Sequence, residues 1–202
     1  EAGAMTRLAM IRHAPTDWNE AGRIQGRHDT MLSEDGRAMV AGWQVPAPLD
    51  TWRWITSPLS RTTTTAALLD HSDCPVDARL AEMDWGAWVG STLDDLRSRH
   101  GDAMADNEAA GLDFRPDDGE SPRELQSRLA AFLRDTAHAG EPTVAITHRG
   151  VMRAALGLAT GWDFTSPQPL KLERDAVLML TLSADGTPEL EDPALLSLVP
   201  SS

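Results

Sequence analysis

The chain has 202 residues, enough for one domain with a complete hydrophobic core, and we expect a single domain over residues 5–202. Its 31 acidic and 18 basic side chains give a net charge of −13, which disfavours nucleic acids and anionic membrane surfaces as partners. The single cysteine excludes an internal disulfide framework and thiolate-rich zinc sites.

The start of the chain and its apolar runs bear on the compartment. No apolar run approaches the about 20 residues that a membrane-spanning helix needs, and no signal-peptide core opens the sequence. We therefore expect a cytoplasmic protein. Residues 1–4, which precede Met5, are interpreted as the remnant of a tag.

The first half of the chain alternates between predicted strands and helices. Short apolar runs predict the strands, and apolar side chains at helical spacing after Ser33 predict a capped helix. Ser57 and Pro58 predict another helix start, with the serine as N-cap and the proline at the first helical position. The predicted elements of this half are a strand over 8–11, a helix over 33–43, a strand over 53–56 and a helix over 57–69.

The second half continues this alternation and ends in a hairpin. Leu125, Leu129, Phe132 and Leu133 recur at i, i+4, i+7 and i+8, the spacing of an amphipathic helix. An Ala-Asp-Gly-Thr turn between two apolar stretches predicts the hairpin. The predicted elements of this half are a helix over 121–138, a strand over 143–147, a helix that includes Met152 and Leu156, and a hairpin whose turn is 184–187.

This order of elements predicts an α/β fold. Strands that alternate with helices favour a mostly parallel sheet with helices on both faces, a three-layer sandwich. Ligands of such sheets bind beyond the carboxyl ends of the strands. Polar residues follow three of the predicted strands at that edge: Arg12 and His13, Ser57 with Arg61, and His148 with Arg149.

Arginines and histidines at one edge of a sheet are suited to phosphate chemistry. The guanidinium fork matches phosphate oxygens, and a neutral imidazole is a competent nucleophile. Each piece alone is ordinary, because single arginines and histidines are most often solvated or structural; only their joint pattern points to a site. A metal site is disfavoured, since the six histidines include no pair at ligand spacing with acids on one helix.

Five ordered motifs make the pattern specific. They are Arg12–Asp29 (RHAPTDWNEAGRIQGRHD), Ser57–Ala66 (SPLSRTTTTA), Leu80–Gly86 (LAEMDWG), Gly119–Ser121 (GES) and Thr147–Gly150 (THRG). In order and spacing they resemble the histidine phosphatase superfamily, the phosphoglycerate mutase-like proteins. The resemblance covers about residues 8–155 and implies the phosphoglycerate mutase-like sandwich.

The resemblance also implies a mechanism and a set of site residues. His13 would attack phosphorus and become a phosphohistidine, and Glu82 would act as general acid and then as general base. The phosphate oxygens would be held by Arg12, Asn19, Gln25, Arg61 and His148. We therefore expect a phosphoric monoester hydrolase that needs no metal and no other cofactor, because the arginines and the histidine neutralise the phosphate charge.

The acidic loop Glu82-Met83-Asp84-Trp85-Gly86 favours the phosphatase branch, since cofactor-dependent mutases usually carry Glu-Arg-His-Tyr-Gly there and this chain has no tyrosine. The loop also resembles that of alpha-ribazole phosphatase-type members. Mutase-type phosphoryl transfer and a regulatory binding module with little turnover remain alternatives. Ala14-Pro15 departs from the usual Gly-Glu, which leaves the position of this loop over the phosphate open.

The expected partner is a small phosphomonoester. Arg27, His28 and Arg115 are candidates to bind a second anionic group on it, and Trp85 is a candidate to stack on a base or sugar ring. By position alone, residues 107–120 are a candidate lid over the site. The sequence leaves the oligomeric state open; the apolar stretch 194–199 would dock either on the body or on a partner, as in a homodimer.

Overall fold

The computed structural model describes residues 5–200, so the expected tag remnant at residues 1–4 lies outside the described residues. Within this range, five strands form one sheet in the order β2-β3-β1-β4-β5. Strands β2, β3 and β1 are parallel to one another, whereas β4 and β5 are each antiparallel to the preceding neighbour. The strands are β1 (Thr6–Arg12), β2 (Arg53–Thr56), β3 (Thr143–Thr147), β4 (Ala176–Leu182) and β5 (Pro188–Ser197).

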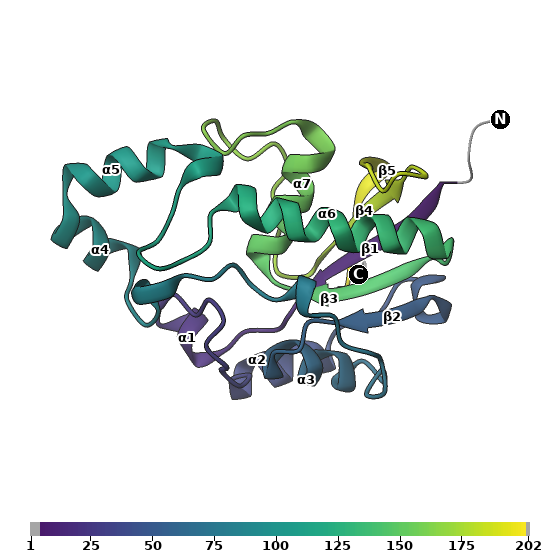
Figure 1. The fold of residues 1–202 in the computed structure, drawn as a ribbon. Helices are drawn as coiled ribbons and strands as arrows, with labels where there is room; N and C mark the ends of the chain where they lie inside the picture. Colours follow the sequence, from purple (N-terminus) through teal and green to yellow (C-terminus); the bar gives the residue numbers. More distant parts are fainter. Residues whose placement is uncertain (1–4, 201–202) are drawn as a thin grey trace.

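Helices cover both faces of this sheet (Figure 1). The α-helices are α1 (Asp17–Glu20), α2 (Glu34–Ala41), α3 (Ser60–Leu68), α4 (Leu93–His100), α5 (Asp102–Ala109), α6 (Pro122–Ala139) and α7 (Arg149–Thr160). The single-turn 3₁₀ helices are η1 (Leu49–Thr51), η2 (Ala78–Leu80), η3 (Gly86–Trp88) and η4 (Gly111–Asp113). Helices α6 and α7 pack on one face, and α2 and α3 on the other, which confirms the three-layer α/β sandwich.

Alternating side chains of β1 divide the core into two halves. Leu8 and Met10 pack with α6 and α7, whereas Ala9 and Ile11 pack in the cluster that includes residues of α2 and α3. All four side chains are fully buried, as expected for a central strand covered on both faces. The sheet is therefore held at a fixed position between two helical layers, and its carboxyl ends are equally fixed.

The capping signals of the sequence are confirmed at two helices. Ser33 accepts a hydrogen bond from the Gly36 amide at the start of α2. Ser121 begins α6 with a reciprocal capping box, in which its hydroxyl accepts from the Glu124 amide and the Glu124 carboxylate accepts from the Ser121 amide. The predicted helix over 121–138 is thus observed over Pro122–Ala139.

The predicted start of the helix over 57–69 is wrong. Helix α3 begins at Ser60, and its N-cap is Leu59, which has no capping side chain. The Ser57 hydroxyl lies instead 2.8 Å from Nε2 of His148. Asp29, from a distant loop, supplies the missing acceptor: its Oδ1 accepts from the Ser60 amide at 2.8 Å. A long-range contact has therefore replaced the local cap.

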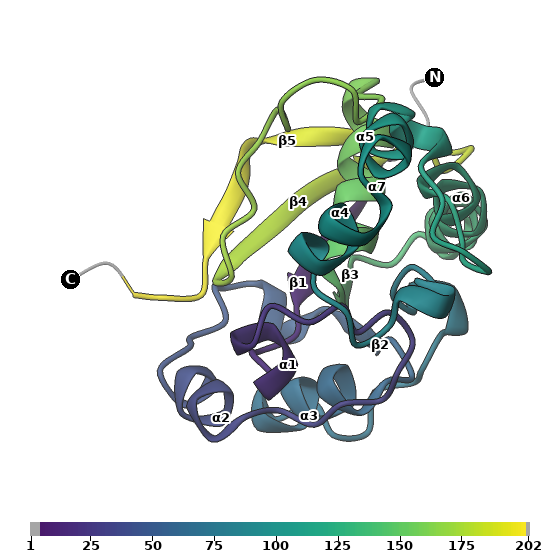
Figure 2. The same ribbon diagram turned by 90° about the vertical axis from the view of Figure 1, so that its left-hand side faces the viewer.

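Helices α4 and α5 were not predicted from the sequence, because each buries a single apolar side chain, Leu96 in α4 and Met104 in α5. These two side chains pack with Trp88 in a small cluster separate from the two sheet-facing halves of the core. Both helices project beyond the carboxyl ends of the parallel strands (Figures 1 and 2). The candidate lid segment, 107–120, contains the end of α5, η4 and the following loop.

The apolar stretch 194–199 docks on the body of this chain. Most of it belongs to β5, which pairs with β4, and Leu195 and Leu196 pack against the two halves of the core. Leu198, just after the strand, is fully buried.

Among residues 5–200, no helix has both the length and the apolar character that crossing a membrane requires.

Candidate active site

The three parallel strands deliver the predicted site residues to one edge. The His13 amide donates to the Thr147 carbonyl oxygen at 3.0 Å, and the Ser57 amide donates to the Ile146 carbonyl oxygen at 3.0 Å. These bonds continue the strand ladders and bring the residues after β1, β2 and β3 side by side. The His13 and His148 ring centroids are consequently 5.3 Å apart.

A cavity of about 400 Å³ opens at this edge. Trp85 and part of the α4–η4 segment contribute to its walls, and Figure 2 looks toward the edge where it lies. The predicted site residues that line it are Arg12, His13, Asn19, Gln25, Arg61, Glu82 and Trp85. His148 is fully buried and does not line the cavity, although its ring lies next to that of His13.

The protonation of His13 follows from its surroundings. Its Nδ1 lies 2.7 Å from the Ala14 carbonyl oxygen, which can only accept, so Nδ1 carries the proton and Nε2 keeps its lone pair. Burial, followed by the charges of Arg61 and Arg12, holds the pKa of His13 well below its usual value of 6.5. The imidazole is therefore neutral at pH 7.

The arginines near His13 are cations without carboxylate partners. Arg61 is 1% exposed and donates to the carbonyl oxygens of His28 and Gly26, at 2.8 and 2.6 Å. Burial and neighbouring arginines lower the pKa of Arg12 to about 9. Among the described residues, neither side chain forms a salt bridge, and the buried Nε of each has no hydrogen-bond partner. Their positive charge is available to an anion.

The Glu82 carboxylate lies at the start of helix α7. Its Oε2 accepts from the Gly150 amide at 3.2 Å, and its Oε1 accepts from the Met83 amide at 2.8 Å. A Cβ on Gly150 would lie 2.2 Å from Oε1, so only glycine leaves room for this carboxylate. Arg128, which sequence reasoning missed, steadies the loop by donating to the carbonyl oxygens of Ala81 and Glu82 at 2.7 and 3.1 Å.

Asn19 and Gln25 are held by their amide oxygens. Oδ1 of Asn19 accepts from the backbone amide of Thr16 at 3.1 Å. Oε1 of Gln25 accepts from the Thr16 hydroxyl at 2.8 Å and from the Thr30 hydroxyl. Because both oxygens accept, the amide nitrogens are the groups left to donate at the cavity wall.

His148 is held through Nε2, whereas His13 is held through Nδ1. Nε2 of His148 lies 2.8 Å from the Ser57 hydroxyl, whereas its buried Nδ1 has no hydrogen-bond partner within residues 5–200. Burial, the nearby His13 and Arg61 hold the pKa of His148 well below its usual value of 6.5. Two neutral imidazoles thus face a region rich in guanidinium groups.

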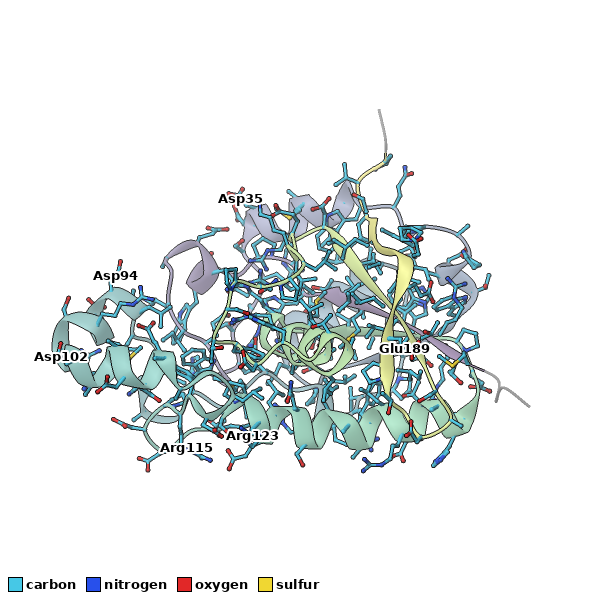
Figure 3. All side chains as sticks on the ribbon, turned by 90° about the horizontal axis from the view of Figure 1, so that it is seen from above. Asp35, Asp94, Asp102, Arg115, Arg123 and Glu189 are labelled. Carbon is cyan, nitrogen blue, oxygen red and sulfur yellow. The ribbon has the colours of Figure 1, made fainter. Side chains whose placement is uncertain are left out.

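Three predicted substrate contacts do not line the cavity. Arg27 is exposed and lies against the Glu120 carboxylate at 3.5 Å. The His28 ring stacks on Trp18, with centroids 4.8 Å apart. Arg115 pairs with Glu124 on the molecular surface and lies at the outer side of the α6 end in Figure 3. Among the four candidates, Trp85 alone is a cavity residue.

Sequence reasoning missed two further arginines near the site. Arg174, in the segment before β4, donates from Nη1 to the His13 carbonyl oxygen at 3.1 Å. Burial, followed by the charge of Arg149, lowers the pKa of Arg174 to about 10. Arg153 lines the cavity from α7. Arg153 follows Arg149 by four residues, which places both side chains on one face of the helix. This spacing is the sequence signal that could have identified Arg153 as a site residue.

The Ala14-Pro15 segment fits without a glycine. Ala14 is not among the residues with positive φ, so its Cβ carries no conformational penalty there. Its amide donates to the Thr65 hydroxyl at 3.0 Å, and the Pro15 carbonyl oxygen accepts from the Ser33 amide at 3.0 Å.

Among residues 5–200, no group of three or more His, Cys, Asp or Glu side chains could hold a metal ion.

Known proteins are similar to this chain over most of its length. The family model described as the histidine phosphatase superfamily (branch 1) matches residues 8–192. A probable phosphoglycerate mutase, GpmB, of Klebsiella pneumoniae is 33% identical, with 86% of this chain and 83% of that protein covered. A glucosyl-3-phosphoglycerate phosphatase of Mycolicibacterium vanbaalenii is 32% identical, with 77% and 74% covered.

Solved structures are similar as well. A mycobacterial glucosyl-3-phosphoglycerate phosphatase, solved as a complex with VO3, is 27% identical with a TM-score of 0.69, covering 87% of this chain and 92% of that one. YhfR of Bacillus stearothermophilus is 28% identical with a TM-score of 0.75, covering 91% and 94%. The sandwich is thus shared with solved proteins.

Proposed function

The chain belongs to the histidine phosphatase superfamily (branch 1), and from this premise we propose that it is a metal-independent phosphomonoesterase acting on a small phosphorylated metabolite through a phosphohistidine. One observation carries the proposal: His13 is buried, neutral and protonated on Nδ1, beside two arginines without carboxylate partners. A neutral nitrogen nucleophile next to unpaired cations suits attack on a phosphate anion.

In the first step, Nε2 of His13 attacks phosphorus and the ester P–O bond breaks. The guanidinium groups of Arg12 and Arg61 bind the oxygens on which charge develops. The amide nitrogens of Asn19 and Gln25, together with His148, complete the set of groups around the phosphate. The Glu82 carboxyl protonates the departing alkoxide, so the alcohol leaves neutral and Glu82 becomes a carboxylate.

In the second step, water attacks the phosphohistidine. The Glu82 carboxylate removes a proton from this water as its oxygen bonds to phosphorus. The N–P bond breaks, its electron pair returns to Nε2 of His13, and inorganic phosphate leaves. The arginines supply the positive charge throughout, so the proposed cycle needs no metal ion.

Replacement of His13 tests the proposal. We expect His13→Ala to lose hydrolysis of p-nitrophenyl phosphate and to lose the protein-bound phosphate that mass spectrometry detects after rapid mixing of the wild type with substrate. His138→Ala is the matched control, because His138 is exposed near the end of α6. A His13→Ala variant that retains activity would contradict the nucleophile. A wild type that binds phosphate without turnover would favour a regulatory binding module.

Phosphoryl transfer between positions of one substrate is the second candidate, because the Klebsiella relative bears the name of a phosphoglycerate mutase. Incubation with 3-phosphoglycerate and 2,3-bisphosphoglycerate separates the two activities. We expect release of inorganic phosphate; rapid exchange of the 2- and 3-isomers would favour the mutase.

The substrate class is a proposal too. Relatives carry names that refer to phosphoserine and glucosyl-3-phosphoglycerate, which supports a small phosphomonoester for this chain. An alpha-ribazole phosphatase activity stays a prediction from the acidic loop. A panel that includes these metabolites, sugar phosphates and nucleotides would rank them by kcat/KM.

A further inference from the structure

Arg153 is a cation in the cavity wall that the proposed mechanism does not use. It lies on α7, three residues after Gly150, whose amide binds Glu82. Its Nε is buried without a hydrogen-bond partner, and within residues 5–200 its guanidinium has no carboxylate partner. Three residues advance a helix by about 4.5 Å along its axis, so the backbone of Arg153 lies less than one turn beyond the amide that binds the general acid.

The charge of Arg153 is costly in this position. Burial, followed by the charge of Arg149, lowers the pKa of Arg153 to about 10, and the charge of the Glu82 carboxylate offsets only part of this effect. Several arginines on the outer surface are paired instead, such as Arg123 with Asp113 at 2.7 Å. Glu108 also lines the cavity, but its carboxylate pairs with Arg97 at 2.7 Å. A partly desolvated guanidinium that forms no salt bridge is a group that an anionic ligand would stabilise.

Aromatic side chains fix the position of Arg153. Its guanidinium carbon lies 5.2 Å from the Trp162 ring centroid and 5.0 Å from that of Phe164, and the two rings stack 4.0 Å apart. Phe164 also lines the cavity, and its φ of 70° is unfavourable for a bulky side chain. Asp163 stabilises this turn by accepting from the amide and hydroxyl of Thr165 at 3.0 and 2.7 Å. Strain of this kind is retained where the surroundings enforce it, commonly at ligand sites.

We propose that Arg153 determines substrate specificity by binding a second anionic group, carried by the same molecule as the reacting phosphate. This inference rests on the proposed phosphatase activity. The guanidinium fork suits a carboxylate or a second phosphate equally. The same cavity has apolar wall residues, including Ile24, Leu93 and Phe114, that can contact the carbon chain of a substrate. The substrate class is a phosphomonoester of an organic acid, or a bisphosphate.

Paired substrates test this assignment. Phosphoserine differs from phosphoethanolamine by one carboxylate, and fructose 1,6-bisphosphate differs from fructose 6-phosphate by one phosphate. We expect Arg153→Gln to lower kcat/KM about 10- to 100-fold for the member with the second anion and to leave the other member within about twofold, because a charged hydrogen bond is lost only there. The pair that shows the split identifies carboxylate or phosphate as the group bound. Arg153→Lys should restore part of the loss, since it keeps the charge but not the fork.

The control variant is Arg37→Gln, which removes an exposed charge on α2. An equal loss on both members of each pair, or no loss on either, would overturn the role of Arg153 while phosphatase activity stands. Wild-type protein that hydrolyses none of the four compounds or p-nitrophenyl phosphate would instead contradict the proposed function itself. Thermal unfolding of each variant separates a folding defect from a change in recognition, and Arg153→Lys provides the readout if Arg153→Gln fails to fold.

Discussion

At the scale of single residues, hydrogen bonds to the backbone define how each site side chain presents its reactive atom. The Ala14 carbonyl leaves Nε2 of His13 free, and the Gly150 and Met83 amides hold the Glu82 carboxylate. The hydrogen bond of His13 involves Nδ1, so Nε2, the atom that attacks phosphorus in the proposed reaction, stays free. The nucleophile is therefore oriented before any substrate binds.

Replacement of Glu82 tests the proton transfers. We expect Glu82→Gln to lower kcat for an alkyl phosphate about 10²- to 10⁴-fold, because the departing alkoxide needs a proton. The loss should be smaller for p-nitrophenyl phosphate, whose leaving group is stable as an anion. Steady-state kinetics on the two substrates measures the difference.

The matched control for this prediction is Glu189→Gln on the outer strand β5, where the side chain is exposed and labelled in Figure 3. Its kcat should equal that of the wild type. An equal loss on both substrates in Glu82→Gln would contradict the role of proton donor.

The sequence predicted which motif residues come together, but not every side chain that surrounds them. Polar residues after short apolar strands placed Arg12, His13 and His148 at one edge, since parallel strands end together. Arg153 was not predicted as a site residue, because an arginine on an amphipathic helix normally has its charged group in solvent. The helix start at Ser57 was misplaced because its hydroxyl contacts His148, a partner 91 residues away that no local pattern contains.

At the scale of elements, helix α2 approaches the loop after β1 at a glycine. A Cβ on Gly36 would lie 2.1 Å from the Pro15 carbonyl oxygen, which also accepts from the Ser33 amide. Backbone thus packs directly on backbone. The position of the loop that follows His13 depends on this close approach.

Replacement of Gly36 tests this dependence. We expect Gly36→Ala to lower the free energy of unfolding by about 1–3 kcal/mol, because the added methyl group forces α2 and the loop apart. Urea denaturation measures the change. Gly42→Ala is the control: its added Cβ meets nothing closer than 3.5 Å, and its φ of −92° suits alanine. A similar loss in both variants would show that the contact with Pro15 is not responsible.

Elements were predictable where burial gave a periodic signal. Helix α6 buries a stripe of apolar side chains and has a capping box, and both features are legible in sequence. Helices α4 and α5 bury one large apolar side chain each, so their pattern does not differ from that of a polar loop. Their helical state depends on packing with Trp88, which only the fold reveals.

At the scale of the whole molecule, a net charge of −13 coexists with a cationic cavity. Most acidic side chains lie outside the cavity, and several pair with surface arginines, such as Glu191 with Arg7 at 2.7 Å. Arg12, Arg61 and Arg153 have no such partners among the described residues. Large polyanions are repelled by the surface, whereas a small anion that enters the cavity meets unpaired positive charge.

The buried histidines make the stability of the fold depend on pH. The pKa values of His13 and His148 lie well below 6.5 in the folded protein, whereas the unfolded chain takes up these protons near 6.5. As the pH falls below 6.5 the unfolded state binds more protons, so the free energy of unfolding decreases, by up to about 1.4 kcal/mol per pH unit for each histidine.

Comparison of the wild type with His13→Asn isolates one of these protons. Urea denaturation between pH 6.5 and 5.5 should give a shallower pH dependence for the variant, because one fewer proton is taken up on unfolding. All other groups are common to both proteins. Identical slopes would contradict a depressed pKa for His13 in the folded state.

The catalytic residues and the outer wall of the cavity come from different parts of the chain, and this affects how the substrate can change during evolution. The nucleophile and its cations follow the sheet and α3, whereas the outer wall comes from the α4–η4 segment and the turn after α7. The α4–α5 pair has its own small cluster of buried side chains, so its length and composition can vary with little disturbance of the sheet. New substrates can then be acquired by replacing a wall, while the reaction itself is inherited unchanged.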